Sequence, residues 1–265
     1  MPICEQKKVE EESMGRLSNR TVIVTGGAQG IGAAYALALA REGARVSVCD
    51  LQTPDETVKA IEEAGGEAMG HICDVTDPSA VARVVRETVD RFATIEGLVN
   101  NAALFATLRP RRFEEIDSTE FDRVMQVNVR GTFECIKAVL PTMRRQKYGK
   151  IVNIASGTVF KGVPMMLHYV SSKGAIIALT RSVAREVGSD GICVNCLAPG
   201  FTLSDGVKNS GEWSTDFFKA NVLSRCLPRD QMPEDLTGTA GFLLSAESDF
   251  MTGQTMLVDG GSAMH

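Results

Sequence analysis

The sequence lacks the features that mark membrane proteins, secreted proteins and multidomain chains. None of its apolar runs is long enough to cross a bilayer, and no Pro/Gly/Ser-rich linker or internal repeat divides its 265 residues. The first twenty residues are too polar for a secretory signal because they have no apolar middle section. We therefore expect a mobile lead-in over residues 1–15 and a single domain over residues 16–265, without membrane association.

A basic surface and a disulfide framework are also missing. The formal net charge of -5 and the lack of a Lys/Arg stripe argue against nucleic acid as a partner. The seven cysteines are scattered, which favours a reducing compartment and predicts a cytoplasmic protein. Cys193 and Cys196 form a C-x-x-C in the run ICVNCLAPG, which is typical of a strand. Their odd spacing sends the sulfurs to opposite faces, so we expect two buried thiols and no metal site.

Short apolar runs alternate with longer helical patterns along the whole chain. The runs are TVIVTG, RVSVCD, EAMGHICD, GLVNNAA, KIVNIAS, ICVNCLAPG and TMLVDGG. Several lack polar alternation, as strands buried on both faces should. Helical patterns cover residues 31–43, 78–92, 118–145 and 169–188, the second with Asp77 as cap and Pro78 as first residue. The alternation predicts an α/β fold, a Rossmann-type doubly wound parallel sheet flanked by helices on both faces, with ligands at the carboxyl ends of the strands.

The first predicted strand runs directly into a glycine-rich turn and a helix. Glycines at such a turn allow a tight bend, and they let phosphates approach the backbone at the helix N-terminus. An ordinary glycine-rich turn is the alternative, but the position between the first strand and a helix favours a dinucleotide site. The residues assigned to this turn are Gly26, Gln29, Gly30, Ile31 and Gly32.

Two carboxylates follow the next strands and bear on cofactor choice. Asp50 ends the second predicted strand, where an acidic side chain can accept hydrogen bonds from the adenosine ribose hydroxyls and would repel a 2′-phosphate. The residues after it are Leu51 and Gln52 rather than Arg or Lys, so the sequence favours NAD over NADP. Asp74, after the third strand, is a candidate for the adenine edge, or alternatively a turn or cap residue.

Tyr169 and Lys173 lie four positions apart, which places both side chains on one face of a helix. A free tyrosine has a pKa of about 10 and is a poor base at neutral pH. A neighbouring ammonium and a cationic nicotinamide would lower that pKa into a useful range, so we expect a lowered pKa for Tyr169 as catalytic acid/base. Ser156, which closes the run KIVNIAS, would bind the substrate oxygen. Asn128 would either bond a backbone carbonyl or hold a water that relays protons from Lys173.

Together these residues resemble the classical short-chain dehydrogenase/reductase family over roughly Arg16 to Gly261. The resemblance rests on the glycine turn, the Asn100-Asn101-Ala102 strand end, Asn128, Ser156, Tyr169, Lys173, Pro199-Gly200 and Val258-Asp259-Gly260-Gly261. Ala103 stands where the family usually has glycine. The resemblance implies a catalytic tetrad of Asn128, Ser156, Tyr169 and Lys173, and a homotetramer with the long helices at an interface. It also implies cofactor contacts, in addition to those above, from Val75, Asn101, Ala102, Tyr169, Lys173, Pro199, Gly200, Thr202 and Ser204.

Substrate residues are expected from three segments, after Asn101, after Ser156 and after Pro199. The last two carry Thr158, Phe160, Met165, Met166, His168, Phe201, Trp213, Phe217 and Phe218, which would line a pocket or simply pack. Arg109, Arg111 and Arg112 would suit an anionic group, but the following Glu114 and Glu115 favour an ordinary solvated face.

Three functions remain open from the sequence. The first is an NAD-dependent oxidoreductase that interconverts a secondary alcohol or sugar hydroxyl with its ketone or lactone. The second is a 3-oxoacyl thioester reductase using NADPH, a role that usually comes with a basic docking patch, which is not evident here. The third is a non-catalytic dinucleotide-binding scaffold, which the complete tetrad disfavours.

Overall fold

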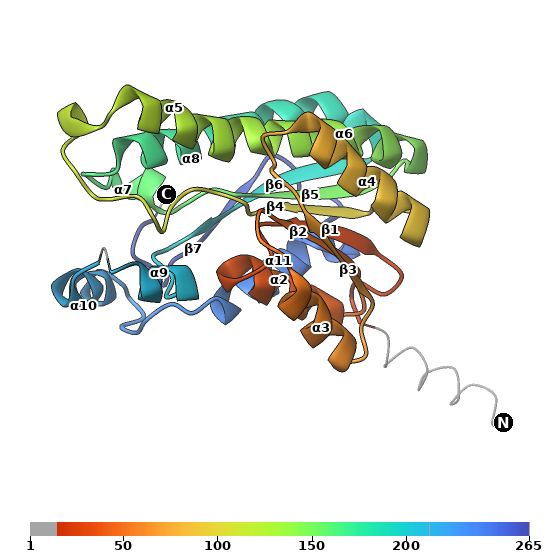
Figure 1. The fold of residues 1–265 in the computed structure, drawn as a ribbon, viewed down its shortest axis with the longest axis horizontal. Coiled ribbons are helices and arrows are strands. Elements are labelled where there is room, and N and C mark those ends of the chain that lie inside the picture. The colour runs from red at the N-terminus through yellow and green to blue at the C-terminus, as the bar shows by residue number, and fades with distance from the viewer. Residues whose placement is uncertain (1–14, 212, 265) are drawn as a thin grey trace.

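The computed structural model describes residues 15–211 and 213–264, and within them all strands form one parallel sheet. The strand order is β3-β2-β1-β4-β5-β6-β7 (Figure 1). The chain adds β2 and β3 on one side of β1 and then crosses over to add β4 to β7 on the other side, so the strand order reverses between β1 and β4. The predicted doubly wound fold is confirmed, and residues 1–14 of the expected lead-in lie outside the described residues. The strands are β1 (Thr21–Thr25), β2 (Arg45–Asp50), β3 (Ala68–Ile72), β4 (Gly97–Asn100), β5 (Gly149–Ile154), β6 (Ile192–Pro199) and β7 (Thr255–Val258).

Helices cover both faces of the sheet because its central strands are apolar on both sides. Every residue of β1, β4 and β5 is buried. In Figure 1, α2, α3 and α11 lie against one face, and α4, α5, α6 and α8 lie against the other. Two separate groups of buried apolar residues fill the two interfaces. The helices are α2 (Gly30–Arg41), α3 (Asp55–Glu63), α4 (Pro78–Phe92), α5 (Ser118–Met125), α6 (Thr132–Gln146), α7 (Thr158–Lys161), α8 (Leu167–Val187), α9 (Asp205–Ser210), α10 (Thr215–Leu223) and α11 (Glu234–Leu244). None of the helices in the described ranges is both long and apolar enough to span a membrane.

Local signals explain where several helices begin. The Asp77 side chain accepts a hydrogen bond from the Ser79 backbone N–H, and Pro78 is the first residue of α4, as predicted. The continuous helix predicted over residues 118–145 is wrong in its middle. A π-helical turn, η2 (Gln126–Gly131), separates α5 from α6. A π turn is built from ordinary helix-forming residues and differs in its hydrogen-bond pattern, so the sequence does not reveal it.

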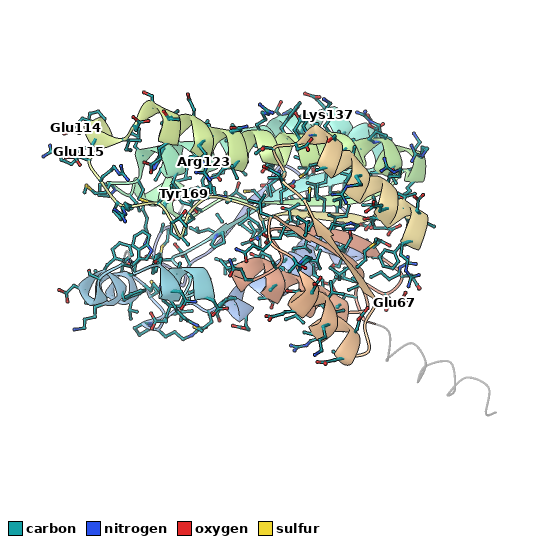
Figure 2. The ribbon with its side chains drawn as sticks, in the orientation of Figure 1. Glu67, Glu114, Glu115, Arg123, Lys137 and Tyr169 are labelled. Atoms are coloured by element: carbon teal, nitrogen blue, oxygen red, sulfur yellow. The ribbon has the colours of Figure 1, made fainter. Side chains whose placement is uncertain are left out.

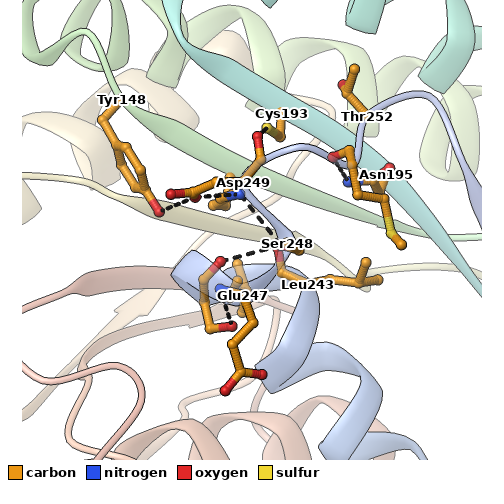
Figure 3. A network of polar contacts seen from close by, with 12 residues as sticks. Tyr148, Cys193, Asn195, Leu243, Glu247, Ser248, Asp249 and Thr252 are labelled. Carbon is orange, nitrogen blue, oxygen red and sulfur yellow. Dashed lines mark hydrogen bonds and ion pairs between the residues drawn. The ribbon is translucent and has the colours of Figure 1, made fainter.

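A polar network ties the C-terminal part of the chain to the amino ends of β5 and β6 (Figure 3). Lys150, only 1% exposed, extends its Nζ atom to 2.8 Å from an Asp249 carboxylate oxygen and 3.3 Å from the Ser248 hydroxyl. The Tyr148 hydroxyl donates to the same carboxylate, and the Cys193 thiol donates to the Asp249 carbonyl oxygen. This network satisfies an ammonium group that the sheet would otherwise bury alone.

The same region tests the prediction for the C-x-x-C cysteines. Both thiols are free, and Cys196 is fully buried. Cys193 is partly exposed and points toward Asp249 instead, so the predicted opposite faces are confirmed. The expectation that both thiols are buried is wrong for Cys193, because the amino end of β6 is close to the protein surface.

The Lys150–Asp249 pair predicts an asymmetric response to substitution. Asp249→Asn leaves a buried ammonium without its counter-charge and should lower the free energy of unfolding by about 1–3 kcal/mol. Lys150→Met replaces the ammonium by an apolar group and leaves the half-exposed carboxylate in water, so its cost should be smaller. Urea unfolding midpoints at neutral pH measure both. A larger loss for Lys150→Met would contradict this account of the network.

Candidate functional site

A crevice with three adjoining parts opens at the carboxyl edge of the sheet. The outer part, with a volume of about 490 Å³, lies beyond the ends of β1, β2 and β4. The central part lies beyond β5 and β6 and shares Gln29, Asn101 and Ala103 with the outer part. An apolar cavity of about 450 Å³ adjoins the central part and shares Tyr169, Phe105 and Phe201 with it. Figure 2 shows Tyr169 between the layer of α5 and α8 and the segment of α9 and α10.

The crevice brings together all the predicted cofactor residues. The outer part is lined by Gly26, Gln29, Asp50, Asp74, Val75, Asn101 and Ala102. The central part is lined by Gln29, Gly30, Ile31, Gly32, Asn101, Ser156, Tyr169, Lys173, Pro199, Gly200, Thr202 and Ser204. Asn128 is the only residue of the predicted tetrad, all four of which are described, that lines neither part.

The turn between β1 and α2 requires glycine at three positions. Gly26 and Gly30 have φ values of +64° and +60°, a conformation that other residues rarely adopt. A Cβ atom at Gly32 would lie 2.0 Å from the Gly26 carbonyl oxygen, so the helix approaches the turn too closely for any other residue. The side chain of Gln29 does not cap α2. The helix N-terminus therefore faces the crevice with its positive end uncapped by a side chain.

Asn101 holds this turn against the end of β4. Its Nδ2 atom donates to the carbonyl oxygens of Thr25 and Gly26, at 3.1 and 3.0 Å. The Thr25 hydroxyl in turn accepts hydrogen bonds from the backbone N–H groups of Asn101 and Ala102, both at 3.0 Å. The side chain predicted to line the cofactor thus also fixes the shape of the phosphate turn.

Two carboxylates and one guanidinium surround the outer part. Asp50 accepts hydrogen bonds from the backbone N–H groups of Ala28 and Gln52, both at 3.1 Å. Asp74 accepts from the backbone N–H and hydroxyl of Thr76, both at 2.8 Å, which supports the turn role considered for it. Arg123 on α5 was missed by the sequence reasoning because nothing in its local pattern distinguishes it from a surface residue. Among the described residues it is the only Arg or Lys that lines the outer part (Figure 2).

Tyr169, Lys173 and Ser156 meet at the junction of the central part and the apolar cavity. Lys173 Nζ lies 5.7 Å from the centroid of the Tyr169 ring and donates to the Ile154 carbonyl oxygen at 2.8 Å. The Ser156 hydroxyl accepts from the backbone N–H and hydroxyl of Thr158, at 3.2 and 3.0 Å, and also hydrogen-bonds the Tyr169 hydroxyl. Ser156 lies two residues beyond the end of β5, slightly later than predicted.

The expected lowering of the tyrosine pKa is wrong for the chain by itself. Burial raises the pKa of Tyr169 to about 12, although the hydrogen bond with Ser156 opposes this rise. Burial also lowers the pKa of Lys173 to about 8, with the nearby Cys196 acting in the opposite direction. Removal from water disfavours the charged forms of both side chains. A phenolate here needs positive charge beyond that of Lys173.

Asn128 sits in the π-helical turn and fixes the loop after β4. Its Oδ1 atom accepts from the Leu104 backbone N–H at 2.8 Å, and its Nδ2 atom donates to the Leu104 carbonyl at 3.3 Å. Nδ2 also donates to the Ser172 hydroxyl at 3.0 Å, next to Lys173 on α8. The alternative in which Asn128 bonds backbone groups is confirmed. Its role in a water relay stays a prediction.

The apolar cavity is built from the three segments predicted to carry substrate residues. Of the residues expected there, Thr158, Met165, Met166, Phe201, Trp213 and Phe217 line it. Phe105, Pro110, Lys161 and Asn221 line it as well and were not singled out individually. Phe105 lies three residues after the Asn-Asn-Ala strand end, so its place in that loop was the signal that could have found it.

Three predicted candidates are engaged elsewhere. His168 is fully buried and its Nε2 atom lies 3.2 Å from a Glu120 carboxylate oxygen, which supports the structural role considered for it. Arg111 pairs with Glu120 at 3.3 Å and Arg112 pairs with Glu114 at 2.8 Å. These pairs support the ordinary solvated face rather than an anion site for those two arginines.

Comparisons with known proteins agree with this geometry. Residues 26–263 match the family described as Enoyl-(Acyl carrier protein) reductase. The chain is 36% identical over 250 residues to the 3-oxoacyl-(acyl-carrier-protein) reductase FabG of Staphylococcus epidermidis, covering 93% of this chain and 100% of that protein. It is 38% identical over 245 residues to the short-chain reductase protein NovJ of Streptomyces niveus, covering 90% and 92%.

Solved structures show the same relationship. The crystal structure of levodione reductase superposes with a TM-score of 0.85 at 30% identity, covering 94% of this chain and 100% of that one. The family match over residues 26–263 includes the turn at Gly26, the ends of β2 to β6 and the helix that carries Tyr169. The chain is therefore an oxidoreductase of the classical short-chain dehydrogenase/reductase family.

Proposed function

We propose that this protein transfers hydride between NAD and a secondary alcohol or ketone with an apolar body, with Tyr169 as the proton donor and acceptor. The observation that carries the proposal is the position of Tyr169, whose side chain lines both the central part of the crevice and the apolar cavity. A substrate in the cavity would thus meet the phenol beside a dinucleotide in the crevice. The third function considered above, a non-catalytic scaffold, would not require this junction.

The residues of the crevice fit a nicotinamide dinucleotide. The Gly26–Gly32 turn would bind the diphosphate, Asp50 the adenosine ribose, and Lys173 the ribose near the reacting centre. Pro199, Gly200, Thr202 and Ser204 would surround the nicotinamide. When bound, the dinucleotide supplies or accepts the hydride.

The protein's own groups would handle the proton. Tyr169 would take the proton from an alcohol during oxidation and return it to the carbonyl oxygen during reduction. Ser156 would orient that oxygen, because its hydroxyl is already positioned against both Tyr169 and Thr158. Lys173, anchored on the Ile154 carbonyl, would favour the phenolate when its ammonium is charged.

The walls of the cavity favour an apolar substrate over a sugar. Phe105, Phe201, Trp213 and Phe217 form a continuous set of ring contacts, with centroid distances from 4.7 to 6.4 Å. Such a surface offers few hydrogen-bond partners to the hydroxyls of a polyol, which would lose their hydrogen bonds to water on binding. An aryl or alicyclic alcohol would gain contact area instead.

A second candidate is the 3-oxoacyl thioester reductase with NADPH. The names of several curated relatives favour it, and their identities to this chain are 34–36%. Arg123 would then be the group that meets the 2′-phosphate, since it is the one cationic side chain on the described lining of the outer part. Asp50 weighs against this candidate because its carboxylate would lie beside that phosphate.

Removal of the phenol tests the proposed role of Tyr169. Tyr169→Phe should lower kcat for 1-phenylethanol oxidation by roughly 10²–10⁴-fold, because the acid/base group is lost, while NADH binding followed by fluorescence is retained. Tyr148→Phe, which removes a hydroxyl far from the crevice, is the control and should leave kcat within about twofold. Turnover by Tyr169→Phe at the wild-type rate contradicts the proposal.

Exchange of Asp50 tests the choice of cofactor. In the wild type, NADH should bind more tightly than NADPH, and Asp50→Asn should shift the ratio toward NADPH by about tenfold because one repulsive charge is removed. Asp55→Asn, on the exposed start of α3, serves as the charge-matched control. Tighter NADPH binding by the wild type, with acetoacetyl-CoA reduced faster than apolar ketones, supports the second candidate instead. Arg123→Gln should then weaken NADPH selectively.

The buried ammonium predicts a pH dependence of stability. The pKa of Lys173 is about 8 in the folded chain but near 10.4 when unfolded, so the unfolded state binds more protons between these values. Stability at Lys173 should therefore rise as pH increases from 8 toward 10. Lys173→Met removes this contribution. At pH 7.5 the variant should have the higher urea midpoint, because it does not bury a charge. At pH 9.5 the midpoints of the wild type and the variant should lie closer together. A difference independent of pH would contradict the lowered pKa.

A further inference from the structure

Thr158 donates two hydrogen bonds to the hydroxyl oxygen of Ser156. Its backbone N–H lies 3.2 Å from Ser156 Oγ, and its own hydroxyl donates to the same oxygen at 3.0 Å. A serine hydroxyl carries two acceptor lone pairs and one proton. One neighbouring residue therefore occupies both lone pairs of Ser156, and only the O–H proton of Ser156 remains for a further hydrogen bond.

Backbone hydrogen bonds on both sides hold Thr158 in this position. Thr158 is the first residue of the short helix α7, and its carbonyl oxygen accepts from the Gly162 backbone N–H at 3.0 Å. The preceding Gly157 donates its backbone N–H to the Pro199 carbonyl oxygen at 2.7 Å, which ties the turn to the end of β6. The two hydrogen bonds to Ser156 thus come from a residue whose backbone is fixed by the fold.

The remaining proton of Ser156 is directed at the reaction site. Ser156 and Thr158 line the central part of the crevice together with Tyr169. In the chain alone, Ser156 hydrogen-bonds the Tyr169 hydroxyl. Because its lone pairs are occupied, Ser156 must be the donor in that bond. A donor to the phenol oxygen stabilises the phenolate, which agrees with the lowering effect of this bond on the pKa of Tyr169.

We propose that Thr158 is a positioning residue that holds the Ser156 hydroxyl as a donor toward the oxygen atom that reacts. This inference rests on the proposed hydride transfer and assigns separate roles within it. Ser156 donates to the substrate oxygen and has no lone pair free for the proton of an alcohol, so that proton goes to Tyr169 alone. The two hydrogen bonds from Thr158 also polarise the Ser156 O–H bond, which strengthens its donation to an oxygen that gains negative charge.

Removal of the Thr158 hydroxyl gives the first measurement. Thr158→Val keeps the backbone N–H donor and the shape of the side chain, and with NAD and 1-phenylethanol its kcat should fall about three- to tenfold, as expected for one hydrogen bond. Thr158→Ser restores the hydroxyl and should bring kcat back to within about twofold of the wild type. Thr237→Val is the matched control, because Thr237 lies on α11 and lines none of the three parts of the crevice. Wild-type kcat in Thr158→Val overturns the proposal.

A double-mutant cycle tests whether Thr158 acts through Ser156. In a Ser156→Ala background the hydroxyl that Thr158 holds is missing, so Thr158→Val should change kcat there by less than about twofold. A loss of the same size in both backgrounds means that Thr158 only packs in the cavity wall, and the proposal fails.

NMR of the cofactor-free protein gives a second measurement that needs no turnover. The chain has three tyrosines, and labelling their Cζ atoms with ¹³C gives one resonance for each, with that of Tyr169 assigned by Tyr169→Phe. Thr158→Val should shift the Tyr169 resonance, because the donor to its oxygen is no longer held. The same exchange in the Ser156→Ala background should leave the resonance in place. A shift of equal size in both backgrounds overturns the proposal.

The two proposals fail in different ways. If 1-phenylethanol is oxidised but Thr158→Val acts equally in both backgrounds, the hydride transfer stands and the inference about Thr158 is wrong. If the Tyr169 resonance responds as expected but neither 1-phenylethanol nor acetoacetyl-CoA is turned over, the role of Thr158 in holding Ser156 stands and the proposed reaction is wrong.

Discussion

Removal of water from the pair of Tyr169 and Lys173 is the constraint on which the site depends. Both side chains are buried, and the Ile154 carbonyl is the acceptor that holds the ammonium in place. Burial makes the neutral forms of both groups more stable. It raises the pKa of Tyr169 and lowers the pKa of Lys173, so both shifts oppose an ion pair of phenolate and ammonium. In the chain alone the phenol of Tyr169 is therefore protonated. Additional positive charge in the crevice is needed to convert it into a base. Under the proposed function, such an arrangement would tie proton abstraction to the presence of an oxidised cofactor.

The carboxyl edge of the sheet could be predicted in detail because the chemistry there depends on local sequence. The glycines at positions 26, 30 and 32 are dictated by backbone conformation and close approach, and such requirements leave a readable pattern. Tyr169 and Lys173 lie on one helix, so their spacing alone places them together. The order of strands and helices likewise follows from alternating patterns, which the seven parallel strands of the described sheet confirm.

Features that depend on distant parts of the chain could not be predicted. Arg123 and Asp50 are far apart in sequence, and they line one cavity only because α5 packs near the ends of β2 and β4. The rise of the Tyr169 pKa in the chain alone could not be predicted, because the sequence shows the neighbouring charge but not the depth of burial.

The π-helical turn at η2 makes the length of this helical segment important for the site. It contains one residue more per turn than an α-helix would, and its Asn128 binds Leu104 in the loop that borders the crevice. Deleting one residue there would restore a regular helix and remove the widened turn in which Asn128 lies. The loop after β4 would then lose the anchor that Asn128 gives it at Leu104. Related chains should therefore accept insertions and deletions at the surface loop before α5 far more readily than within Gln126–Gly131.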